Sequence, residues 1–224
     1  MEESMKKIIA LIISAALIAA IAIGGTLAYL TSSANDTPLH NTFVSDPVLL
    51  DITLDEAPVD ATTGQVITGA RRTQNEYPII PGEVMSKDPT ITVVGGSQPC
   101  YVFAYISNTA KVTAAAVGAT AKTVVSGINI NTAVWDEVAA GLFVYSQTDP
   151  VTHELTPLVV NKMASNQVLT PVFTEITINP ALLTEDVNGA KSGELKVQAF
   201  AHQANGNVDF ADVLTQAKAQ FGIA

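Results

Sequence analysis

Cysteine is almost absent from this 224-residue chain, which holds only Cys100. A single cysteine excludes an intramolecular disulfide, so a stable fold has to rest on an ordinary hydrophobic core. The chain is long enough to form such a core in one domain. We interpret Cys100 itself as a small core residue, because it heads an apolar run typical of a strand.

Basic residues are also scarce. The chain has 11 Lys and Arg against 21 Asp and Glu, a formal net charge of −10. Past residue 28, the only adjacent basic pair is Arg71-Arg72. Phosphate backbones are bound by clustered Lys and Arg, so the composition argues against nucleic acid as a partner.

Catalytic motifs are missing as well. The sequence HELTP (153–157) resembles an HExxH zinc motif, but Pro157 replaces the second histidine and opposes the helix that the motif needs. The other histidines are His40 and His202, and we expect His202 to be a partly exposed strand residue. No G-x-S-x-G elbow or phosphate-binding loop occurs. The sequence therefore predicts no catalytic residues, no cofactor and no metal site, and a non-enzymatic role is favoured.

One long apolar run is present, at the N-terminus. Lys6 and Lys7 precede sixteen residues, 8–23, that are apolar apart from one serine. As a helix they reach about 24 Å, short of the roughly 30 Å hydrocarbon core. A basic start, a short apolar stretch and small residues are typical of a secretory signal peptide over 1–28, with Thr26 and Ala28 at the small positions before the cut. The alternative is an uncleaved membrane anchor, 8–30, and it stays open.

The rest of the chain has the pattern of β-structure. Short runs rich in aromatic and β-branched residues are separated by Gly, Pro, Asn and Asp. In the run 100–107, the even-numbered side chains from Val102 to Ile106 share one face, and the aromatic Tyr101, Phe103 and Tyr105 share the other. We predict strands within 48–55, 90–94, 100–107, 141–146, 168–178 and 194–203. The prediction is an all-β, jelly-roll-like sandwich over 46–224, preceded by an N-terminal signal helix.

Helix is expected only at the C-terminus. Asp209 is a candidate N-cap and Gly222 a stop, and apolar residues between them recur at helical spacing. Residues 132–141 fit either a short helix or a strand. Residues 110–130 fit a hairpin or a long loop, and 55–83 form a long connection rich in turn residues.

Four stretches of the sequence resemble a known family. GGTLAYLTSS (24–33) and NTFVSDPVLLDITLDE (41–56) are similar to the signal junction and first strand of TasA/camelysin-like proteins. The junction match rests on the segment Gly24 to Tyr29, and the second on Asn41 to Phe43. YPIIPGEVMSKDPTITVVGGSQPCYVFAYIS (77–107) and ELKVQAFAHQANGN (194–207) add to the resemblance.

This resemblance implies an exported protein of a Gram-positive bacterium, cut between Ala28 and Tyr29 by a SipW-type signal peptidase. TasA-like members are secreted biofilm-matrix proteins that polymerise into fibres at the cell surface. Camelysin-like members carry a metallo-endopeptidase label, for which this sequence offers no ligand pattern. A monomeric surface adhesin is a third alternative. The membrane is then a partner only through the uncleaved signal.

The fibre interpretation makes residues 29–45 a candidate donor strand. An extended segment completes the sheet of a neighbouring copy through main-chain hydrogen bonds, and a head-to-tail contact of this kind grows into a filament. Tyr29, Leu30, Thr31 and Phe43 are the candidate residues. The alternative is a disordered N-terminal tail.

Overall fold

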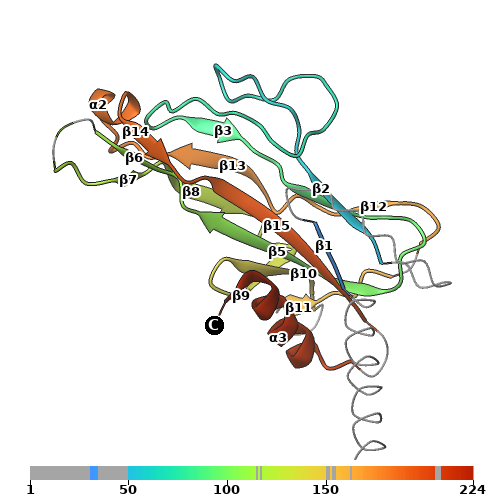
Figure 1. The fold of residues 1–224 in the computed structure, drawn as a ribbon. Helices are drawn as coiled ribbons and strands as arrows, with labels where there is room; N and C mark the ends of the chain where they lie inside the picture. The colour runs from blue at the N-terminus through green and yellow to red at the C-terminus, as the bar shows by residue number, and fades with distance from the viewer. Residues whose placement is uncertain are drawn as a thin grey trace, which may run out of the picture.

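Strands dominate the protein in the computed structural model, which describes residues 31–34, 50–114, 116, 118–149, 152, 155–161, 163–204 and 208–223. The signal helix expected at the N-terminus, and the cleavage point after Ala28, lie outside these residues. In the described part, every strand pairing is antiparallel, and the two helices are both short (Figure 1).

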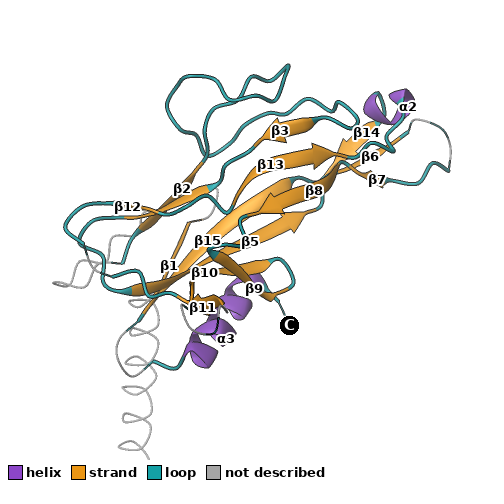
Figure 2. Cartoon of the chain, turned by 180° about the vertical axis from the view of Figure 1, so that it is seen from behind, coloured by secondary structure: helices purple, strands orange, loops and turns teal. Residues whose placement is uncertain are grey.

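The largest sheet has six strands in the described part of the chain. Its order is β1 (Thr31–Ala34), β15 (Leu195–Gln203), β5 (Cys100–Asn108), β10 (Leu142–Thr148) and β11 (Leu155–Pro157), with β9 (Trp135–Ala139) also paired to β10. β5 and β15 are the longest strands and pair along their whole length, from Leu195 opposite Asn108 to Gln203 opposite Cys100. This pair forms the centre of the molecule (Figure 2).

Three smaller sheets complete the described strands. One contains β12 (Gln167–Val168), β4 (Thr90–Val93) and β2 (Ile52–Asp55). Another contains β3 (Val84–Ser86), β13 (Phe173–Ile178) and β8 (Val125–Ile130). The last contains β14 (Ala190–Ser192), β6 (Lys111–Thr113) and β7 (Lys122–Thr123), with the one-turn helix α2 (Thr184–Val187) nearby.

The alternation in β5 divides its side chains between two cores, as the sequence predicts. Val102, Ala104 and Ile106 belong to the main core, which also holds side chains of β2, β4, β13 and β15. Tyr101, Phe103 and Tyr105 belong to a second, aromatic core on the other face of the sheet. Because successive strand residues point to opposite faces, one nine-residue strand supports both cores.

The second core is covered by the C-terminal helix α3 (Phe210–Phe221). Asp209 caps it by accepting a hydrogen bond from the Ala211 N–H at 3.0 Å, and Gly222 ends it in the left-handed conformation. Val213 and Ala217 on its inner face are fully buried. The sequence prediction of this helix, with its cap and its stop, is confirmed.

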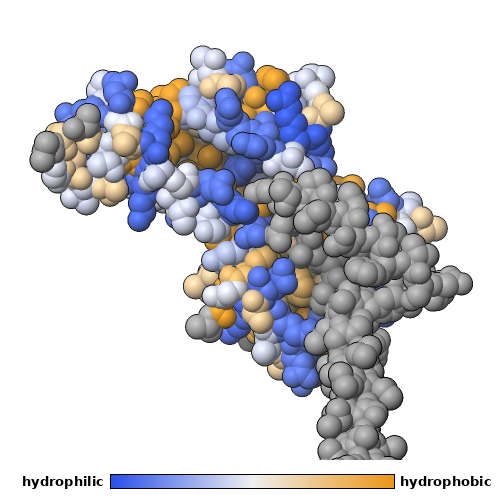
Figure 3. Space-filling model, in the orientation of Figure 1, coloured by the Kyte–Doolittle hydropathy of each residue, from blue (hydrophilic) through white to orange (hydrophobic). Residues whose placement is uncertain are grey.

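The long connection 56–83 is held together by polar contacts and isolated bridges. The Arg71 guanidinium donates to the Asp55 and Asp88 carboxylates, at 2.5 and 2.9 Å, and also to the Thr90 hydroxyl at 2.7 Å. Val66 and Ile67 are exposed, and the surface here mixes hydrophilic and hydrophobic residues (Figure 3). Arg71 thus has a structural role, fixing both ends of the connection.

Two alternatives that the sequence leaves open are decided by the fold. Residues 132–141 contain the strand β9, because Trp135 is buried against the main core and donates its Nε1–H to the Thr170 carbonyl at 3.0 Å. Residues 110–130 contain the β6–β7 hairpin followed by β8.

The fold class is therefore all-β and sandwich-like, with a short C-terminal helix on the outer face of the large sheet. Among the described residues, neither helix has the length and apolar character needed to cross a membrane.

Candidate assembly site at the edge of the large sheet

The strand β1 forms the outer edge of the six-stranded sheet. Its backbone pairs antiparallel with β15, placing Thr31 opposite His202 and Ala34 opposite Ala199. β1 and β15 are separated by most of the chain. A segment near the N-terminus therefore completes a sheet built largely from the C-terminal half. Thr31 is the one candidate donor residue that the structure describes, and its segment is a strand in the sheet of its own chain.

The stretch of β15 that pairs with β1 is also its most buried part. Ala199, Phe200, Ala201 and His202 are each at most 3% exposed, whereas residues 195–198 are partly exposed. Backbone N–H and C=O groups in such a buried strand need partners, because a buried polar group without one costs about 1–3 kcal/mol. In this structure β1 supplies the backbone partners on that side of β15.

The strand β2 also lies close to the pair formed by β1 and β15. β1 lies against β2 as well as β15, and β15 also contacts β2 (Figures 1 and 2). β1 thus lies where the large sheet meets the β12–β4–β2 sheet. A strand removed from this position would expose the junction of two sheets and not only one edge.

The expectation that His202 is partly exposed is wrong, since only 3% of it is exposed. Its Nδ1 lies 2.9 Å from the Gln203 carbonyl oxygen, and its Nε2 lies 3.2 Å from the side-chain amide of Gln216 on α3. Periodicity in β15 places His202 on one face of the strand, but it does not show that α3 folds back over that face. The ring therefore connects β15 to the helix α3.

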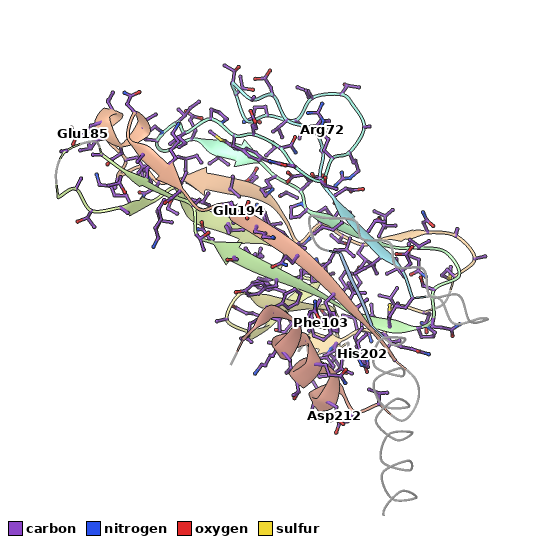
Figure 4. All side chains as sticks on the ribbon, viewed as in Figure 1. Arg72, Phe103, Glu185, Glu194, His202 and Asp212 are labelled. Carbon is purple, nitrogen blue, oxygen red and sulfur yellow. The ribbon has the colours of Figure 1, made fainter. Side chains whose placement is uncertain are left out.

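Aromatic contacts attach α3 to this part of the sheet. Phe210 packs edge-on against Tyr101 with 5.2 Å between ring centroids, and Phe221 stacks on Tyr105 at 5.0 Å. Phe103 and His202 lie where the helix meets the sheet (Figure 4). The helix keeps β5 and β15 fixed on one face, so the edge of β15 is presented by a rigid support.

The motif residues considered in the sequence do not form a metal centre in the described part of the chain. The described residues contain no group of three or more His, Cys, Asp or Glu side chains placed to hold a metal ion. Cys100 is fully buried, and burial raises the pKa of its thiol to about 12. His153 and Glu154 of the HELTP stretch lie outside the described residues, while Leu155–Pro157 form β11.

The other predicted site residues also lie outside the described part. These are Thr26, Ala28, Tyr29, Leu30 and Phe43. The sequence predicts an extended segment over 29–45 that could pair with a neighbouring copy, but it does not predict the pairing seen in the structure, with residues 199–202 of β15 in the same chain. The apolar residues at the end of the run 194–203 indicate a buried strand. They do not show whether that strand lies at the edge or in the interior of a sheet.

The chain matches no family model, no curated protein and no solved structure with which it was compared.

Proposed function

We propose that this protein is an exported structural component of the cell surface or biofilm matrix. It assembles with itself by exchanging β1 between neighbouring chains. The observation that carries this proposal is the β1–β15 pairing, in which residues just beyond the predicted cleavage point complete the sheet.

The position of β1 in the sequence supports exchange. With cleavage after Ala28, Thr31 is the third residue of the mature chain, so β1 has a free end as soon as the signal is removed. Residues 35–49 separate it from the first described residue of the domain, Leu50. Fifteen residues span at most about 50 Å when extended, which allows β1 to reach a neighbouring copy.

The energetics of exchange are also favourable. A strand from a second chain makes the same backbone hydrogen bonds to β15 as the chain's own β1, so the exchange changes few contacts. A neighbour that gives its strand to the next chain is left with its own β15 edge to fill. Where each chain passes its strand onward and not back, the contact is head-to-tail and gives a filament.

The resemblance to TasA/camelysin-like proteins points in the same direction. We propose the same jelly-roll arrangement for this chain as the finer description of its sandwich. We also propose that a SipW-type peptidase releases it, and that β1 becomes available at that step. The signal then delays assembly until export.

Electron microscopy of two purified chains tests the proposal. The chain beginning at Tyr29 is expected to form filaments, whereas a chain beginning at Asp46 lacks β1 and is expected to stay monomeric. A synthetic peptide of residues 29–45 should bind the trimmed chain, and a peptide of the same composition in scrambled order should not.

Other outcomes would contradict the proposal in distinct ways. Filaments formed by the trimmed chain would show that β1 is not the connector. A Tyr29 chain that remains monomeric at high concentration would favour the surface adhesin. Stoichiometric zinc in the purified chain, with chelator-sensitive cleavage of protein substrates, would favour the metallo-endopeptidase.

A further inference from the structure

Glu56 and Lys87 form an ion pair inside the protein. The Lys87 ammonium contacts the Glu56 Oε2 atom, and the two side chains are 10% and 7% exposed. In the other ion pairs of the described residues, the cation is Arg71 or Lys122, and its side chain is at least 35% exposed. Among these ion pairs, Glu56–Lys87 is therefore the one in which both side chains are shielded from water.

The backbone holds the two side chains together. Glu56 exchanges both backbone hydrogen bonds with Arg72, each at 2.8 Å, and the Lys87 N–H donates to the Thr174 carbonyl at 3.0 Å. The Ala57 N–H donates to the Asp88 carboxylate at 2.6 Å, which ties the residues after each partner to one another. The contact between amine and carboxylate is therefore fixed by the fold.

Tyr77 covers the pair. Its ring centroid lies 5.3 Å from Lys87 Nζ, and its hydroxyl is buried without a hydrogen-bond partner in the described part of the chain. Burial raises the pKa of Tyr77, and the negative charges of Glu56 and Asp88 raise it further. The phenol therefore stays protonated, and its hydroxyl keeps a proton that it can donate near the buried pair.

The competing acid is already occupied. Asp88 Oδ2 accepts from Arg71 Nη1 at 2.9 Å, and Asp88 Oδ1 accepts from the Ala57 N–H. Glu56 is thus the acid that faces Lys87. A proton transferred across this buried contact goes from the Lys87 ammonium to the Glu56 carboxylate. The product is a neutral amine, which is a nucleophile, in contact with a neutral carboxylic acid.

We propose that Lys87 and Glu56 condense into an intramolecular isopeptide bond. Lys87 Nζ attacks Glu56 Cδ, a C–N bond forms, and a C–O bond breaks. The displaced carboxyl oxygen leaves as water and takes the protons released by the amine and the acid. No oxidant or further reactant is consumed, and the Tyr77 hydroxyl donates a hydrogen bond to the oxygen on which charge develops.

Fixed contact between the reacting groups favours this step, because holding two groups in place raises their effective concentration to about 10⁵–10⁸ M in well-oriented systems. The bond replaces two buried charges with a neutral amide. It also closes a covalent loop around residues 57–86, which contain most of the long connection, and the lone Cys100 cannot do this. The inference does not depend on the proposed assembly through β1.

Mass spectrometry of the purified, folded chain tests it. The N-terminal residue is first determined by sequencing. The measured intact mass is then compared with the mass calculated for the sequence that begins at that residue. We expect a deficit of one water molecule per chain. Trypsin should leave Lys87 uncut and yield a branched peptide that joins the segments containing Glu56 and Lys87.

A chain with its full sequence mass would overturn the proposal, and so would a water loss that fragmentation places at other residues, such as an imide at an aspartate. Lys87→Arg keeps the charge but removes the amine, and it is expected to restore the full mass. Lys122→Arg is the matched control. The Lys122 side chain is 35% exposed, so its pair with Asp186 should not condense, and this variant should still lose one water. A Lys87→Arg chain that also loses water at Glu56 would contradict the assignment. The wild-type measurement decides the question even where a variant fails to fold.

Discussion

Ser32 on β1 lies opposite Ala201 on β15 in the antiparallel register. Directly opposite residues in such a pair have Cα atoms about 4.5–5.5 Å apart, within the range that a disulfide spans. A disulfide between these two positions would therefore show whether β1 comes from the same chain or from a neighbour.

We expect the variant Ser32→Cys/Ala201→Cys, with Cys100→Ala to remove the native thiol, to report strand exchange. Oxidation before assembly should lock β1 onto its own chain and keep the protein monomeric. Oxidation after assembly should link neighbouring chains into a ladder of covalent multimers on a non-reducing gel.

The matched control places the disulfide between Thr53 and Thr92, which face each other across β2 and β4. That bond leaves β1 free, so the oxidised control should still assemble. Monomer alone after oxidation of preformed filaments would show that β1 stays on its own chain.

Gly141, in the turn between β9 and β10, has φ +71°, and a Cβ added there would lie 2.7 Å from the Ile106 carbonyl oxygen. Gly141→Ala should combine left-handed backbone strain with this clash and cost about 2–4 kcal/mol in the free energy of unfolding. Gly96→Ala is the control, since Gly96 has φ +89° and nothing within 4 Å of its added Cβ. It should lose only about 1–2 kcal/mol. Urea denaturation measures both, and equal losses would contradict the steric argument.

The Asp209 cap should contribute measurably to the attachment of α3. Asp209→Ala removes the acceptor for the Ala211 N–H, and we expect a loss of about 1 kcal/mol. Asp212→Ala removes an exposed acid from the same first turn without removing the cap, and it should lose only about 0.3–1 kcal/mol. Thermal denaturation followed by the near-ultraviolet signal of the aromatic residues provides the measurement. A larger loss for Asp212→Ala would refute the assignment of the cap.

Asp186 should make stability depend on pH in the acid range. The Leu183 N–H, at 2.7 Å, and the Lys122 ammonium, also at 2.7 Å, lower the pKa of this carboxyl in the folded state. A lowered folded pKa gives stability that is present above the unfolded pKa and is lost as pH falls through the folded value. Asp186→Asn should therefore flatten the fall in urea midpoint with decreasing pH below about pH 4.

Glu185→Gln serves as the control for that measurement, because Glu185 is exposed on the same helical turn. Its acid profile should follow that of the wild type. An Asp186→Asn profile as steep as the wild-type one would assign the acid sensitivity to other carboxyls.

Much of the secondary structure was predictable because its causes are local. The alternation in 100–107 placed its aromatic and aliphatic side chains on separate faces, and the structure assigns these faces to separate cores. Asp209 and Gly222 marked the ends of α3, because capping depends on residues within one turn. The long connection 55–83 was likewise evident from its turn residues.

Side-chain periodicity and local hydrogen bonding account for the all-β class, the C-terminal helix, the buried state of Cys100 and the strands β2, β4, β5, β10, β13 and β15. Three contacts depend on the tertiary structure: β1 pairs with β15, α3 buries His202, and Lys87 meets Glu56. Each of these contacts joins residues that periodicity describes separately. Which strand edges meet depends on how the sheets pack around the common core, and short segments carry no record of that packing.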